Sequence, residues 1–255
     1  GAGGFKEIDD VAIAKPLVKY SIQITDGERI GEFVERAWQA ATSGYPGPVH
    51  LSLPVDIMFS SFEEDAGRDE RPWVRHQTRP QRAWPEPKRL TDILNIVENS
   101  ERPVIIGGHG IWWSHSEKSL AEVGEKLKIP IFNVPYHTKL LGEDCSANMG
   151  LADFHQYHPS KMAIHEADTV IMVGGRLDNQ MNFGNPPFIP KDTKLICVNG
   201  SSEELEYNFA ADEILAGHQC STGIYDRCLK RCFAKILRFA GHQQYLLEYF
   251  LIVFF

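Results

Sequence analysis

Cysteine is scarce in this sequence. There are five cysteines in 255 residues, and no two of them form a Cys-x-x-Cys pair. An odd, scattered set in a chain of this length does not fit a disulfide scaffold or a cysteine-rich zinc site. The sequence also lacks any run near the ~20 apolar residues that a membrane-spanning helix needs. These absences predict a cytoplasmic protein for which a membrane is not an expected partner.

Positive charge is scarce as well. The formal net charge is -8, and no dense cluster of lysine and arginine makes a local exception. A chain with that charge has no general attraction for phosphate backbones, so nucleic acid is not an expected partner. Hydrophobic residues make up 43% of the sequence, which is enough to bury a core in one large domain or two modest ones.

The first quarter of the chain carries one clear helix signal and one strand signal. Apolar residues recur at intervals of three and four across residues 26–43, which predicts a helix with one buried face. Glycines and prolines at 44–48 end this helix, and an apolar strand follows at 49–53. Residues 59–86 are rich in charge and proline, which predicts a linker.

After the linker, short apolar segments alternate with helical patterns. The expected helices cover residues 87–99, 116–127, 158–166 and, more briefly, 201–205. The expected strands cover residues 103–106, 129–134, 169–173 and 194–198. This alternation predicts an α/β fold with a doubly wound, Rossmann-like parallel sheet that helices cover on both faces.

The two ends of the sequence differ from the rest. Glycine-rich residues 1–5 are typical of a turn inside a domain, and residues 220–255 end in an apolar run with no evident solvent-facing side. We therefore expect a fragment of a longer protein. Its predicted parts are a partial α/β unit at 1–58, the linker at 59–86, a central domain at 87–219, and an aberrant or truncated tail at 220–255.

Several ordered motifs resemble the thiamine diphosphate enzymes, a superfamily that includes acetolactate synthase and 2-hydroxyacyl-CoA lyase. Residues 5–9 resemble its Phe-Gln-Glu segment, and residues 16–20 resemble its Pro-x-x-Lys-Tyr strand. The run Gly-Tyr-Pro-Gly-Pro-Val-His-Leu-Ser-Leu-Pro-Val-Asp at 44–56 is similar to the last strand of the pyrimidine-binding domain. Residues 102–108 and 167–176 resemble the central domain.

The resemblance implies an activity for the parent protein. It implies a lyase or carboligase that uses thiamine diphosphate and Mg²⁺ on 2-keto acid or acyl-CoA substrates, in a homodimer or homotetramer. The family's diphosphate and magnesium motif is Gly-Asp-Gly, which occurs nowhere in this sequence. We therefore expect no catalytic residue and no metal site here, and an inactive isolated chain. The alternative is a non-catalytic nucleotide-binding or structural α/β module.

Two residues near the start are candidates for the substrate's surroundings. Phe5 and Lys6 stand where the family has Phe-Gln, so Lys6 could pair with a carboxylate or a CoA phosphate, whereas the alternative is an ordinary surface lysine. Acetolactate synthases resemble one another in a Pro-Lys-Asp sequence at the end of the later strand. Val55 replaces that lysine here, which argues against acetolactate synthase activity in the strict sense.

Residues of the central domain are candidates for binding a nucleotide. Gly107 and Gly108 follow a strand and precede a helix, so their amides could face a phosphate; the alternative is a tight connection from strand to helix. Arg176 resembles the arginine that contacts the diphosphate in family members that bind FAD or ADP. These residues make FAD or ADP a candidate cofactor of this domain.

Two departures from the family pattern argue against FAD. Asn199 stands where nucleotide-binding relatives have Asp or Glu, and it loses the charge-assisted bond to a ribose. His155 is retained, but the glycines of a Gly-Met-His-Gly stretch are replaced by bulkier residues around it. Trp112 and Trp113 could stack on an adenine, although burial against the neighbouring helix is the commoner outcome for such side chains.

Overall fold

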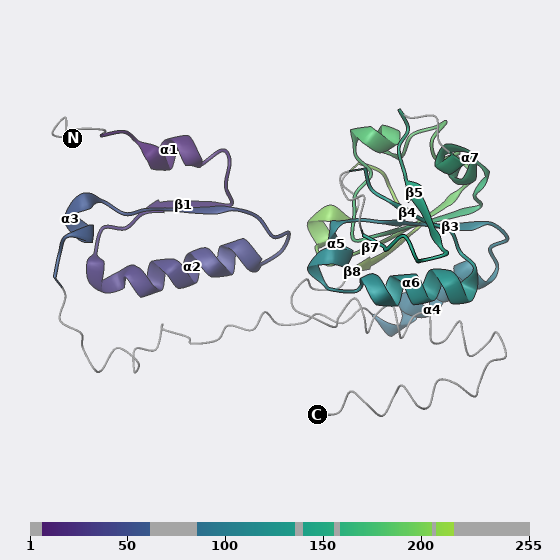
Figure 1. Cartoon of the computed structure of the whole chain (residues 1–255), viewed down its shortest axis with the longest axis horizontal. Helices are drawn as coiled ribbons and strands as arrows, with labels where there is room; N and C mark the ends of the chain where they lie inside the picture. Colours follow the sequence, from purple (N-terminus) through teal and green to yellow (C-terminus); the bar gives the residue numbers. More distant parts are fainter. Residues whose placement is uncertain (1–6, 62–85, 136–139, 156–158, 206–207, 217–255) are drawn as a thin grey trace, which may run out of the picture. The chain divides into compact units, whose positions relative to one another are not determined.

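The computed structural model describes residues 7–61, 86–135, 140–155, 159–205 and 208–216 (Figure 1). The chain forms two compact units, Gly1–Pro80 and Gln81–Phe255. Most of the predicted linker at 59–86, the whole tail at 220–255, and the candidates Phe5 and Lys6 lie outside the described residues.

The first unit is a small sheet between two helices. Strands β1 (Tyr20–Gln23) and β2 (Val49–Ser52) pair in parallel, and helix α2 (Ile30–Thr42) connects them. Helix α1 (Asp10–Ala14) lies on the face opposite α2, as Figure 1 shows. The short helix α3 (Val55–Met58) follows β2.

Helix α2 confirms the helix predicted at 26–43. Its entry is a 3-10 turn, Gly27–Arg29, at which the Asp26 carboxylate accepts a hydrogen bond of 3.0 Å from the Glu28 amide. The buried face consists of Phe33 and Ala37, four residues apart. The strand predicted at 49–53 is also confirmed, as β2.

The second unit is a six-stranded parallel sheet. Its strands are β3 (Pro103–Gly107), β4 (Ile131–Asn133), β5 (Asn148–Leu151), β6 (Thr169–Val173), β7 (Lys194–Asn199) and β8 (Glu213–Ala216). They lie in the order β5-β4-β3-β6-β7-β8, which is the 3-2-1-4-5-6 order of the Rossmann fold. The predicted doubly wound sheet is therefore confirmed.

Helices cover both faces of this sheet. They are α4 (Pro87–Glu98), α5 (His109–Trp113), α6 (Glu117–Leu127) and α7 (Pro159–Glu166), with 3-10 segments at Asn179–Gly184 and Ser202–Glu204. The sequence pattern predicted all of these except α5 and the segment at 179–184. It also gave no signal for β5 or β8, which are the outermost strands of the sheet.

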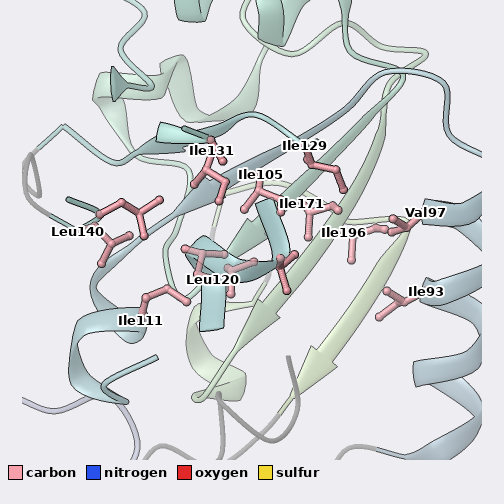
Figure 2. Close-up of a cluster of buried hydrophobic side chains, with 14 of the residues drawn as sticks. Ile93, Val97, Ile105, Ile111, Leu120, Ile129, Ile131, Leu140, Ile171 and Ile196 are labelled. Carbon is pink, nitrogen blue, oxygen red and sulfur yellow. The ribbon is translucent and has the colours of Figure 1, made fainter. Parts of the chain in front are cut away.

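The core has two layers, one on each side of the sheet. Consecutive strand residues alternate between them: Ile105 belongs to one layer, and its neighbours Val104 and Ile106 belong to the other. Figure 2 shows the first layer, in which residues of α4 and α6 such as Val97 and Leu120 pack with strand residues such as Ile105. Because both faces are buried, the central strands are almost continuously apolar.

Asp168 joins the amino ends of β3 and β6. Its carboxylate accepts hydrogen bonds from the Ser100 hydroxyl, from the Glu101 amide at 2.6 Å and from the Arg102 amide at 3.1 Å. Burial raises the pKa of this carboxyl, but the three hydrogen bonds outweigh it and hold the pKa below its usual value. Asp168 is therefore an ionised carboxylate that fastens residues 100–102, before β3, to the start of β6. We call this arrangement the Asp168 clamp.

Candidate functional site

The sheet reverses its winding between β3 and β6. The chain proceeds from β3 to β4 and β5 on one side, and from β6 to β7 and β8 on the other. In sheets of this kind ligands bind outside the carboxyl ends of the strands at such a switch point. The candidates Gly107, Gly108, Arg176 and Asn199 all lie at the carboxyl ends of β3, β6 and β7.

The glycines at this point pack against one another. A Cβ atom on Gly108 would lie 2.5 Å from the Cα of Gly175, and one on Gly174 would lie 2.8 Å from the Cα of Gly110. Gly174 also has a φ of +66°, in the left-handed region that glycine tolerates best. The loops that follow β3 and β6 are therefore in direct backbone contact.

Two amides of the glycine turn after β3 donate hydrogen bonds to the end of β6 and the loop that follows it. The Gly108 amide donates to the Val173 carbonyl at 2.9 Å, and the Gly110 amide donates to the Gly174 carbonyl at 2.7 Å. Each amide has one proton, so these two do not point at a phosphate in this conformation. Of the two alternatives for the turn, this geometry favours a tight connection over an anion site.

Gly107, the last residue of β3, makes room for core side chains. A Cβ there would lie 2.6 Å from Leu140 Cδ2 and 3.2 Å from Leu120 Cδ2. Both leucines belong to the layer drawn in Figure 2. The position of Gly107 is explained by packing and does not require a ligand.

Asn199 fastens the end of β7 to the loop after β6. Its side chain is 3% exposed, and its Nδ2 donates to the Gly175 carbonyl at 3.2 Å. Its Oδ1 accepts from the Ser201 amide at 3.3 Å. An aspartate has no proton for the Gly175 carbonyl, so the amide suits this position better than the carboxylate of nucleotide-binding relatives.

Replacing Asn199 by alanine is expected to destabilise the chain by about 1–2 kcal/mol, because a buried carbonyl and an amide lose their partner. Asn199→Asp should also be less stable than the wild type, since aspartate lacks the side-chain amide that donates to the Gly175 carbonyl. Urea denaturation followed by far-UV circular dichroism measures both. Equal midpoints for the wild type and both variants would contradict this role.

Arg176 lies beside a buried carboxylate that the sequence did not single out. Its Nε is 3.6 Å from Oε2 of Glu204, whose side chain is 9% exposed, whereas that of Arg176 is 41% exposed. Burial raises the pKa of Glu204, and the Arg176 charge offsets only part of this effect. Glu204 was missed because its sequence signal, two adjacent glutamates after a strand, is also typical of an exposed turn.

Replacing Glu204 by glutamine is expected to stabilise the chain at neutral pH, by roughly 1 kcal/mol or less. With a raised pKa, the folded state favours the protonated form. The contribution of Glu204 to the free energy of unfolding is fully present below the ordinary glutamate pKa of about 4.3. It declines as the pH rises through the raised pKa of the folded state. Urea denaturation should show the variant's advantage growing from pH 4 to pH 7, and an advantage independent of pH would contradict this.

His155 is an exposed residue two positions after the buried Asp153. Its amide donates to the Asp153 carboxylate at 2.8 Å, and its ring Nε2 is 3.2 Å from the Asn179 carbonyl. The ring thus has a local partner in the segment that follows β6. Among the described residues, no group of three or more His, Cys, Asp or Glu is arranged to hold a metal ion.

Of the two alternatives for Trp112 and Trp113, burial against the neighbouring helix is not observed. They are 50% and 47% exposed, and their rings meet edge to face with centroids 5.0 Å apart. Helix α5 has only five residues and buries Gly110 and Ile111, so both indoles face outward. Val55, at the start of α3, is 64% exposed.

Comparison with known proteins identifies the family. A model of the "Thiamine pyrophosphate enzyme, central domain" matches residues 90–219, which is just over half of the chain. The chain belongs to the thiamine pyrophosphate enzyme family. The matched residues include the glycines that pack together after β3 and β6, so this contact lies within the part of the chain that matches the family's central domain.

Individual relatives agree with this assignment. The acetolactate synthase large subunit of Lactococcus lactis is 31% identical over 80% of this chain and 35% of its own length. The 2-hydroxyacyl-CoA lyase 1 of Dictyostelium discoideum is 29% identical over 78% of this chain and 33% of its own length. The structure of benzoylformate decarboxylase from Polynucleobacter necessarius superposes with a TM-score of 0.65 and 21% identity, covering 82% of this chain and 38% of that one.

The chain spans about a third of the length of the curated relatives that it matches. The names of these relatives are those of enzymes, two synthase subunits and a lyase. In the described part of the chain, no helix combines the length and the apolar character needed to span a membrane.

Proposed function

We propose that the parent protein is a thiamine diphosphate- and Mg²⁺-dependent lyase or carboligase that acts on 2-keto acids or 2-hydroxyacyl-CoA. The match of residues 90–219 to the family's central domain carries this proposal. Relatives named acetolactate synthase, 2-hydroxyacyl-CoA lyase and oxalyl-CoA decarboxylase support the substrate class. When bound, thiamine diphosphate supplies the carbanion that attacks a carbonyl carbon.

In this proposal the chain supplies structure and the rest of the parent supplies the chemistry. Residues 1–58 are the end of the pyrimidine-binding domain, and residues 87–219 are the central domain. Because the sequence contains no Gly-Asp-Gly motif, the residues that hold Mg²⁺ and the diphosphate are not among these 255. The isolated chain is catalytically silent, and Phe5 and Lys6 border the substrate only in the parent, a cytoplasmic homodimer or homotetramer.

The test is a recombinant protein extended on both sides of this sequence. With added thiamine diphosphate and Mg²⁺ it should turn over pyruvate or a 2-hydroxyacyl-CoA, whereas the 255-residue chain should not. Isothermal titration calorimetry should detect thiamine diphosphate binding to the extended protein only. An extended protein that binds no thiamine diphosphate would contradict the proposal.

For the central domain, we propose a scaffold without bound FAD or ADP. The amides of Gly108 and Gly110 are committed to backbone carbonyls, and Asn199 is committed to Gly175, which supports a structural role. Arg176 is 41% exposed and is paired with Glu204 at 3.6 Å. FAD, ADP and CoA should each leave the thermal midpoint of the chain unchanged, and a saturable upward shift with any of them would favour the nucleotide-binding module instead.

A further inference from the structure

Helix α1 in the first unit is held by polar contacts. It has five residues, and none of them is buried. Three apolar side chains in and beside it are exposed, Ile8 at 66%, Ile13 at 55% and Leu17 at 74%. A helix this short is not stable by itself in water, so its position depends on what fastens it to the sheet.

The fastening consists of two hydroxyl groups, one from each strand. The Ser52 hydroxyl donates to the Asp10 carboxylate at 2.6 Å, and the Ser21 hydroxyl lies 3.3 Å from the Val11 carbonyl. The Ser52 bond, opposed by partial burial, holds the pKa of Asp10 below its usual value. Asp10 is therefore ionised at neutral pH, and its bond to Ser52 has the added strength of a charged acceptor.

His50 completes the arrangement beneath α1. Its Nδ1 is 3.0 Å from the Ser21 hydroxyl oxygen. A hydroxyl has one proton, so Ser21 can donate to Val11 only if His50 Nδ1 carries a proton and donates to Ser21. A positive charge on His50 lowers the pKa of Asp10 further. The four side chains of Asp10, Ser21, His50 and Ser52 thus act on the same helix, and we name them the α1 latch.

The latch extends along the two strands, because Ser21 and His50 are the second residues of β1 and β2 whereas Ser52 is the last residue of β2. Through its bond to Ser52, Asp10 places the chain entering α1 beside the carboxyl ends of the parallel strands. Ligands of parallel α/β sheets bind on this side. The Asp10 end of α1 therefore lies on the side of the sheet where ligands are expected, whereas the Val11 contact lies nearer the amino ends of the strands.

We propose that α1 is a strap that the α1 latch holds along β1 and β2, with its Asp10 end beside the carboxyl end of β2, and that it opens as a unit while the rest of the sheet stays folded. Two observations support separate opening. The strap buries no side chain, whereas α2 on the other face buries Phe33 and Ala37. Segments with few buried apolar contacts open at low free energy.

Hydrogen exchange of the full chain, measured by mass spectrometry, tests the strap. The reporters are the amides of Ile13 and Lys15, which donate to Asp9 and Val11 within α1. In the Ser52→Ala variant they should exchange about tenfold faster, which corresponds to the loss of about one hydrogen bond. Peptides from α2 should exchange at the wild-type rate.

Three further variants separate the latch from a general loss of stability. Asp10→Asn keeps an acceptor but loses the charge, so its effect should be smaller than that of Asp10→Ala. Asp56→Asn is the matched control, because it removes an exposed carboxylate of α3 and should leave α1 unchanged. The proposal is overturned if α1 is unprotected in the wild type, if Ser52→Ala leaves it unchanged, or if α1 and α2 accelerate together.

Discussion

Replacing Gly108 by alanine is expected to destabilise the central sheet by more than about 3 kcal/mol. The new Cβ would lie 2.5 Å from the Cα of Gly175, 2.7 Å from the Gly174 carbonyl and 2.8 Å from the Gly175 nitrogen. All three are backbone atoms, so no rotamer change relieves the clash. Relief requires the loops after β3 and β6 to separate, which breaks the hydrogen bonds between them.

Urea denaturation followed by far-UV circular dichroism measures this loss. Gly150→Ala is the matched control, because Gly150 has a φ of +95° but nothing within 4 Å of its Cβ position. It should lose only the ~1–2 kcal/mol of an unfavourable backbone conformation. A Gly108→Ala variant as stable as Gly150→Ala would refute the tight contact at the switch point.

Replacing Asp168 by alanine is expected to cost about 2–3 kcal/mol at pH 7, because three hydrogen bonds to an ionised acceptor are lost. Asp168→Asn should recover only part of this, since its NH₂ group meets further donors from Glu101 and Arg102. The control is Asp192→Asn, an exposed aspartate in the turn before β7. Urea midpoints of the three variants give the comparison.

The same clamp predicts a pH dependence. The folded-state pKa of Asp168 lies below the unfolded value, so its contribution is complete above about pH 4 and is lost as the pH falls through the lower, folded value. The difference between wild type and Asp168→Ala should therefore shrink on acidification. A difference that stays constant from pH 7 to pH 3 would contradict the ionised clamp.

The sequence predicted the central sheet well where its strands are buried on both faces. Residues 103–106, 169–173 and 194–198 are apolar runs, and all three match observed strands. The edge strands β5 and β8 gave no such signal, because β5 carries Asn148, Met149 and Gly150 and β8 begins with Glu213. An edge strand is less buried by neighbouring strands and helices, so it carries fewer apolar residues and its sequence resembles that of a loop.

The candidate site was predicted in position but not in its internal contacts. The sequence placed Gly108, Arg176 and Asn199 after strands, where the structure has them. It could not show that Gly108 faces Gly175, because that contact depends on which strands are neighbours in the sheet. Glu204 as the partner of Arg176 was hidden for the same reason, since the two residues follow different strands.

The strand order has a consequence for how the central unit folds. On one side β3, β4 and β5 follow one another in the sequence, and on the other side so do β6, β7 and β8. Among the described strands, these two halves pair with each other where Pro103 to Gly107 lie beside Thr169 to Val173. Pairing β3 with β6 closes a loop that contains β4 and β5, and this has a larger entropic cost than pairing strands nearer in sequence. We therefore expect each half to gain structure early and the pairing of β3 with β6 to limit the folding rate.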